Sequence, residues 1–131
     1  PEDFLIGHRK EARDRKISIL NDLDILYTEQ TELMAKIEKI NDRVGSDYEE
    51  ERGDGMVFHR EFTSDDAKAY SYSERRRLTE VKDKIKGKLA AAVSLGMHSE
   101  PWTIHKRPGE TLNVPVYVSE MCEKYRVPLG K

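Results

Sequence analysis

Residues 17–44, ISILNDLDILYTEQTELMAKIEKINDRV, decide the fold expected for this chain, because their apolar residues recur in alternating steps of four and three. This spacing is that of a coiled-coil seam, in which one stripe of a helix packs against a facing helix. We expect the helix to span residues 8–44 and to stop at Gly45. The seam residues expected to form an oligomer interface are Ile19, Leu23, Leu26, Gln30, Leu33, Ile37 and Ile40.

Gln30 is the only polar residue of this set. A lone polar residue in a coiled-coil seam sets the register of the helices at some cost in stability. Gln30 is therefore expected to find its hydrogen-bond partner across the interface. Leu20, Tyr27 and Met34 widen the apolar stripe on one side, and a stripe of this width predicts more than one helical neighbour.

A second helix is predicted over residues 72–95, ending before Gly96. Ser71 and Glu74 match a capping box at its start. Its apolar residues again follow mixed steps of three and four, and they are Leu78, Val81, Ile85, Leu89, Ala92 and Leu95. The fold class is therefore mainly α, with the two long helices forming an antiparallel hairpin that resembles a coiled-coil bundle.

Basic residues lie on both flanks of the second helix, which is typical of charges that select a helical partner. One pair, Lys84 and Lys88, is expected to face Asp22 and Glu29 of the first helix in an antiparallel hairpin. The match is partial, because basic residues continue the same flank of the first helix. The alternative interpretation is contact with nucleic acid or with an acidic partner, and the candidates are Arg75, Arg76, Arg77, Lys82 and Lys86.

The segment 45–70 between the helices is acidic and punctuated by glycine at its start. Its first part, SDYEEERGDG, is typical of an exposed loop. The following stretch, MVFHREF at 56–62, alternates apolar and polar residues and predicts a short strand.

The last segment, 100–131, is expected to form a β-hairpin and a short helix. The stretches WTIHK and TLNVPVYV are separated by RPGE, whose Pro-Gly pair fits a type II turn. Pro115 limits the second stretch to an edge strand, and the 56–62 strand is a candidate third member of this sheet. Ser119 is expected to cap a helix that carries Met121 and Tyr125 inward.

Composition and charge narrow the function classes. The net charge of −2 hides a segregation, since residues 1–44, 45–66 and 67–131 carry −2, −6 and +6. The single cysteine, Cys122, favours a reducing, cytoplasmic location over a disulfide-linked secreted scaffold. No stretch approaches the roughly 20 apolar residues of a membrane span.

The sequence carries no nucleophile motif or phosphate-binding loop, so we expect no enzyme activity and no cofactor. His98, His105 and Cys122 match no zinc-site spacing, and no metal site is expected. The leading hypothesis is a single-domain helical interaction protein, an adaptor or inhibitor, that self-associates as a dimer or tetramer and docks on another protein. The alternative is a nucleic-acid-binding protein without sequence preference.

Overall fold

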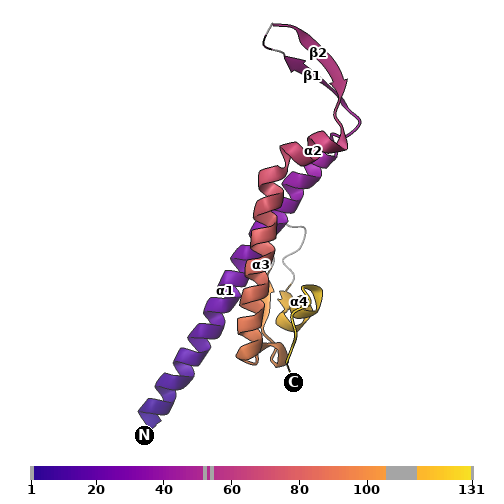
Figure 1. The fold of residues 1–131 in the computed structure, drawn as a ribbon. Coiled ribbons are helices and arrows are strands. Elements are labelled where there is room, and N and C mark those ends of the chain that lie inside the picture. The colour runs from indigo at the N-terminus through magenta and orange to yellow at the C-terminus, as the bar shows by residue number, and fades with distance from the viewer. Residues whose placement is uncertain (1, 52, 54, 106–114, 131) are drawn as a thin grey trace. The chain divides into compact units, whose positions relative to one another are not determined.

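The computed structural model describes residues 2–51, 53, 55–105 and 115–130. It is mainly α, as predicted, with the long helices α1 and α3 packed antiparallel and two small two-stranded antiparallel sheets (Figure 1). The elements in chain order are α1 Glu2–Asn41, β1 Asp47–Glu51, β2 Val57–Glu61, α2 Ser64–Tyr70, α3 Tyr72–Ser94, the 3-10 helix η1 Met97–Ser99, β3 Thr103–His105, β4 Pro115–Tyr117 and α4 Val118–Lys124.

Both long helices lie close to their predicted positions. The first begins at Glu2 and ends at Asn41 instead of spanning 8–44, and the second ends at Ser94, one residue early. The helix therefore begins six residues earlier and ends three residues earlier than the apolar stripe and Gly45 indicated. The chain forms two compact units, Pro1–Gln30 with Val81–Lys131, and Thr31–Glu80.

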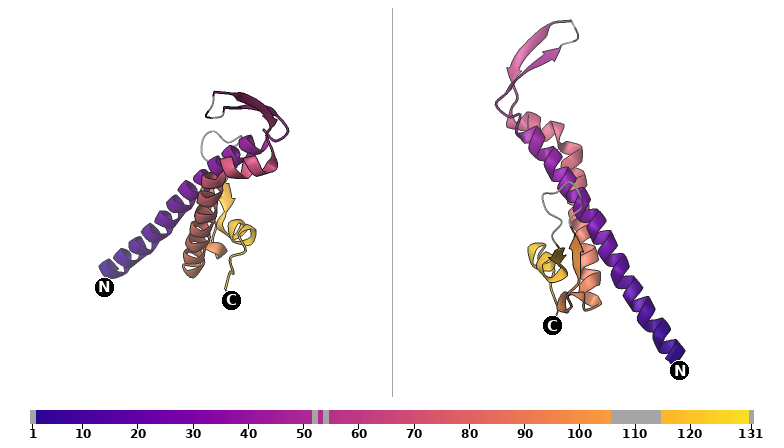
Figure 2. Two further views of the ribbon diagram at one scale, coloured as in Figure 1. Left: turned by 45° about the horizontal axis from the view of Figure 1, so that its top comes forward. Right: turned by 180° about the vertical axis from the view of Figure 1, so that it is seen from behind.

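The first unit has a core built from the apolar stripes of both helices. Leu23 of α1 and Ile85 and Leu89 of α3 are fully buried. Residues three and four apart share a helix face, so the predicted stripe of α3 lies on one side and is covered there. The core continues into the C-terminal elements η1, β3, β4 and α4, which lie beside α3 in both views of Figure 2. Their buried side chains are Met97, Ile104, Val118, Met121, Cys122 and Tyr125.

The C-terminal β-hairpin is confirmed in the described part of the chain. Strand β3 pairs antiparallel with β4, with Ile104 opposite Val116 and His105 opposite Pro115. The predicted turn at 107–110 and the start of the second stretch lie outside the described residues. The predicted capping role of Ser119 is wrong, because α4 begins at Val118 and its N-cap is Tyr117. Met121 of α4 and Tyr125, which directly follows the helix, are buried as expected.

The second unit corrects two expectations. The segment predicted as an acidic loop forms β1, and the 56–62 strand pairs with β1 and not with the C-terminal sheet. In this register Asp47 and Glu49 lie opposite Glu61 and His59. All four side chains are exposed, so the carboxylates keep their hydration within the strands. Pairing with the nearest strand in sequence also needs the least loop closure.

A buried aromatic residue anchors this unit at the base of the hairpin. Phe62 is 0% exposed, and its ring centroid lies 5.6 Å from that of Tyr48 and 5.5 Å from that of Tyr70. The guanidinium of Arg43 lies 4.5 Å from the Phe62 centroid, a cation–π contact. The backbone of Phe62 bonds to Gly45 and Ser46 at the end of α1. These contacts join β2 to the helical part of the same unit.

Helix α2 was not expected, and its presence changes the start of α3. Thr63 and Asp66 form the capping box of α2, with Thr63 Oγ1 accepting from the Asp66 amide at 3.2 Å and Thr63 N donating to Asp66 Oδ2 at 2.9 Å. The predicted capping role of Ser71 is wrong. Ser71 ends α2, and its hydroxyl donates to the Ala67 carbonyl at 2.6 Å and accepts from Arg75 Nε at 2.7 Å.

Candidate functional site

The residues expected to form an oligomer interface lie largely in the core of the chain itself. Five of the seven are buried, namely Ile19, Leu23, Gln30, Leu33 and Ile37. The other two, Leu26 and Ile40, are partly exposed. The burial of these five residues therefore needs no second copy.

Gln30 also finds its hydrogen-bond partner within the chain. Its Oε1 accepts from the hydroxyl of Tyr125, which directly follows α4, and both side chains are buried. The expectation of a partner across an oligomer interface is thus corrected. Burial raises the pKa of the Tyr125 hydroxyl, which keeps it a neutral donor to Gln30.

The five basic candidates differ in their surroundings. Arg75 is held by Ser71 and by Asn41, whose Oδ1 lies 3.1 Å from Arg75 Nη2. Arg76 and Arg77 both approach the carboxylate of Glu80, at 4.0 and 3.3 Å. The remaining two are the exposed lysines Lys82 and Lys86, which form no ion pair with another described residue. Each of the three arginines thus has a polar contact within its own unit.

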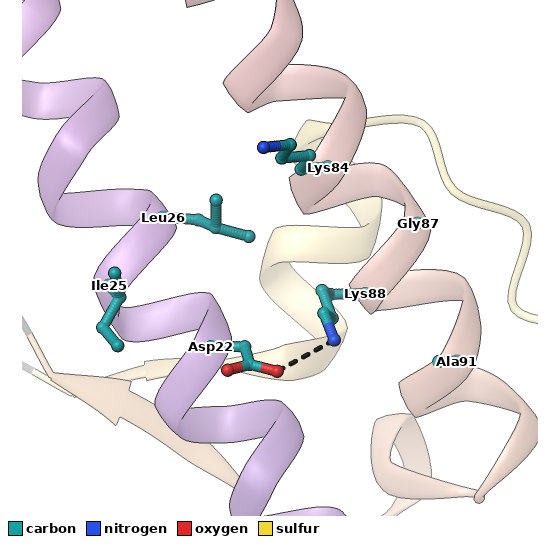
Figure 3. Close-up of a pocket in the computed structure, with 7 residues that line it drawn as sticks. All are labelled: Asp22, Ile25, Leu26, Lys84, Gly87, Lys88 and Ala91. Atoms are coloured by element: carbon teal, nitrogen blue, oxygen red, sulfur yellow. Dashed lines mark ion pairs between the residues drawn. The ribbon is translucent and has the colours of Figure 1, made fainter.

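A groove lies between α1 and α3 within the first unit (Figure 3). It has a volume of about 540 Å³ and is open to solvent. Residues three or four apart on each helix line it, because such residues share one face. The lining residues are Asp22, Ile25, Leu26, Lys84, Gly87, Lys88 and Ala91, and none comes from the described C-terminal elements.

The wall from α1 is unusually apolar for a surface. Ile25 leaves 55% of its surface exposed, and Leu26 beside it is partly exposed. Ile25 falls outside the four-and-three seam, and for this reason the seam pattern did not single it out. The sequence does give one indication of Ile25: it is an aliphatic residue beside the seam position Leu26, on a flank of the helix that otherwise carries charged residues.

The wall from α3 is low, because glycine and alanine face the groove. Gly87 and Ala91 are one helical turn apart and lie on the same side of α3. A Cβ atom at Gly87 would meet nothing within 4 Å. The hollow over Gly87 is therefore open space that the described residues do not fill.

The two walls carry opposite charges. Asp22 Oδ2 lies 2.8 Å from Lys88 Nζ, so the expected meeting of these flanks is confirmed for this pair. Lys84, one turn before Lys88, forms no ion pair with another described residue. Glu29 lies two turns after Asp22 on the same flank of α1. The lining of the groove thus carries one carboxylate, Asp22, on the α1 side and two ammonium groups, Lys84 and Lys88, on the α3 side, beside apolar residues of both helices.

The described residues hold no group of three or more His, Cys, Asp and Glu side chains that could bind a metal ion. Burial raises the pKa of the Cys122 thiol, which makes it a poor nucleophile. Within the described ranges, no helix has the length and apolar character needed to cross a membrane. Comparison of the chain with protein-family models, with curated proteins and with solved structures found no match.

Proposed function

We propose that this protein is an interaction module that binds an amphipathic helix of a partner protein in the groove between α1 and α3. The observation that carries the proposal is the exposed Ile25 beside the hollow over Gly87 and Ala91. Such a protein acts as an adaptor or as an inhibitor of its partner, and it needs neither a cofactor nor catalytic groups.

The shape of the groove suits a helix better than a small molecule. It runs between two helices and is open, whereas sites for small ligands enclose most of the ligand surface. Small residues let the axes of two helices approach closely, and large aliphatic residues then fill the groove. A helix lying there would cover Ile25 and Leu26, which the chain leaves exposed.

The charges select the chemistry of that helix. Because Asp22 is paired with Lys88, the ammonium of Lys84 is the charge at the groove that has no ion-pair partner among the described residues. A helix with an aliphatic face and a flanking row of carboxylates satisfies both features. The single, buried thiol of Cys122 is compatible with a reducing compartment, and we place this activity in the cytoplasm.

Two labelled synthetic peptides test the proposal. Both form an amphipathic helix with a leucine and isoleucine face, and they carry either glutamates or lysines along the flank. Fluorescence anisotropy at low protein concentration should show tighter binding of the glutamate peptide. Gly87→Leu should abolish this binding by filling the hollow, and Ala90→Leu, outside the groove on the same helix, should not.

Absence of binding by both peptides, or binding that Gly87→Leu leaves intact, would overturn the helix-binding role. A labelled single-stranded oligonucleotide in the same assay tests the alternative function. Binding that falls steeply with salt and is lost on replacing Arg75, Arg76 and Arg77 by alanine would assign a nucleic-acid role instead.

A further inference from the structure

We infer that the helix bound in this groove is α1 of a second copy of the same chain, so that two chains form a symmetric pair. The inference rests on the helix-binding role proposed above and names its partner. The two walls of the groove are complementary to each other in charge and in shape, and this is the condition for an interface that a chain makes with itself about a two-fold axis.

Charge fixes the direction of the axis. The acidic wall with Asp22 belongs to α1, and the basic wall with Lys84 and Lys88 belongs to α3. A two-fold axis parallel to the helices places α1 of each copy over α3 of the other, so Asp22 of each copy lies at the level of Lys88 of the other. An axis across the helices would place like walls together, which repels. The parallel axis also makes every neighbouring helix antiparallel, as in a four-helix bundle.

Shape agrees with the same axis. The Asp22–Lys88 ion pair shows that these two residues lie at one level of the hairpin. Because the helices run antiparallel, Leu26, one turn after Asp22 on α1, and Lys84, one turn before Lys88 on α3, define a second common level. The groove residues Ile25 and Gly87 both lie between these two levels. Rotation about a parallel axis keeps levels unchanged, so Ile25 of one copy meets the hollow over Gly87 of the other.

Gly87 supplies a second, independent observation. It lies inside α3 with no left-handed backbone angle, and a Cβ would meet nothing within 4 Å. Alanine in an exposed helix interior is more favourable than glycine by about 1 kcal/mol. No described residue of the chain uses the space left by the missing side chain. Glycine at this position therefore leaves room for the close approach of a side chain that is not among the described residues, and we assign this space to Ile25 of the second copy.

The test begins with the mass of the intact chain, measured by light scattering during size-exclusion chromatography. The wild type should elute at twice the 15.2 kDa of one chain. Ile25→Glu and Gly87→Leu should each reduce the mass to that of a single chain. The matched controls Ile17→Glu and Ala90→Leu should leave the pair intact, because both positions are exposed and lie outside the groove.

A mixing experiment distinguishes an interface from a folding defect. Ile25→Ala removes the aliphatic residue and Gly87→Leu fills the hollow, so neither variant should pair well with itself. In a mixed pair, one contact joins the introduced leucine to the introduced alanine, and the symmetric contact keeps the native Ile25 and Gly87. Equal amounts of the two variants should therefore recover the doubled mass, which two misfolded chains would not do.

The outcomes separate the two proposals. If the wild type has the mass of a single chain but still binds the glutamate peptide, the second copy is not the partner, and the helix-binding role stands. A single-chain mass without peptide binding overturns both. A doubled mass that Ile25→Glu and Gly87→Leu leave unchanged, or that mixing fails to recover, also overturns the proposed pairing, because the chains would then associate through another surface.

Discussion

The hydroxyl of Tyr125, at the C-terminal end of α4, donates a hydrogen bond to Oε1 of Gln30 on α1, and both side chains are buried. The two residues are 95 positions apart in the chain. This bond gives the polar residue of the α1 stripe its partner and ties the C-terminal helix to α1. Lys124 adds a neighbouring contact, with its ammonium 5.7 Å from the ring centroid of Tyr27.

Tyr125→Phe should lower the free energy of unfolding by about 1–3 kcal/mol, because it leaves a buried amide oxygen without a donor. Gln30→Leu should have a similar effect, because it leaves the buried hydroxyl of Tyr125 without an acceptor. Urea unfolding followed by the fluorescence of Trp102, the chain's only tryptophan, measures both. The double variant should lose less than the sum of the two single losses. Strict additivity would show that the bond contributes nothing.

Alkaline pH should destabilise the protein in a manner that depends on Tyr125. Burial raises the pKa of its hydroxyl above the ordinary value of about 10, so folding favours the neutral form. The resulting stability is complete below about pH 10 and is lost as the pH rises through the folded-state pKa. Urea midpoints measured across this range should fall less steeply for Tyr125→Phe than for the wild type. Equal slopes would contradict the burial of the hydroxyl.

Phe62→Ala should cost about 3–5 kcal/mol in the second unit, because this fully buried ring contacts Tyr48, Tyr70 and Arg43. Hydrogen exchange should accelerate first in the amides of β1 and β2. Val57→Ala, at an exposed position of the same hairpin, serves as the control and should cost less than about 1 kcal/mol. Equal rates of amide exchange in β1 and β2 of the two variants would show that Phe62 does not anchor the hairpin.

Acid below about pH 4 should loosen the start of α2 through Asp66. The backbone hydrogen bond from Thr63 holds the pKa of this carboxyl below its ordinary value, and the Thr63 hydroxyl and Arg60 add to the effect. Its contribution is therefore present above about pH 4 and is lost as the pH falls through the lowered pKa. Asp66→Asn should therefore make stability depend less on acid pH. Unfolding followed by circular dichroism at several pH values measures this. Asp65→Asn, next to it and outside the capping box, should not.

The two long helices could be predicted because their evidence is local. Apolar residues at steps of three and four define a buried helix face whatever covers it, so the stripes of α1 and α3 are visible in the sequence. Strand β1 was not predicted, because its sequence DYEEE has low strand propensity. Only its pairing with Arg60 and His59 on β2 makes these residues a strand.

The candidate groove was predicted in part. The flank charges predicted that Asp22 and Glu29 face Lys84 and Lys88, and the structure shows an ion pair between Asp22 and Lys88. The sequence did not reveal that Ile25 and Gly87 face a common opening, because each lies outside the stripe that defines its own helix. Their proximity depends on how one helix is rotated against the other, which no local spacing contains.

By itself, the sequence determined where the long helices run and which of their faces must be covered, because helix periodicity and the cost of exposing apolar side chains act within short segments. The tertiary structure decided what covers those faces. Gln30 bonds to Tyr125 of its own chain, and the covered stripe leaves Ile25 and Gly87 at an open groove. These outcomes depend on contacts between distant segments, whose free energies are settled only when the elements pack together.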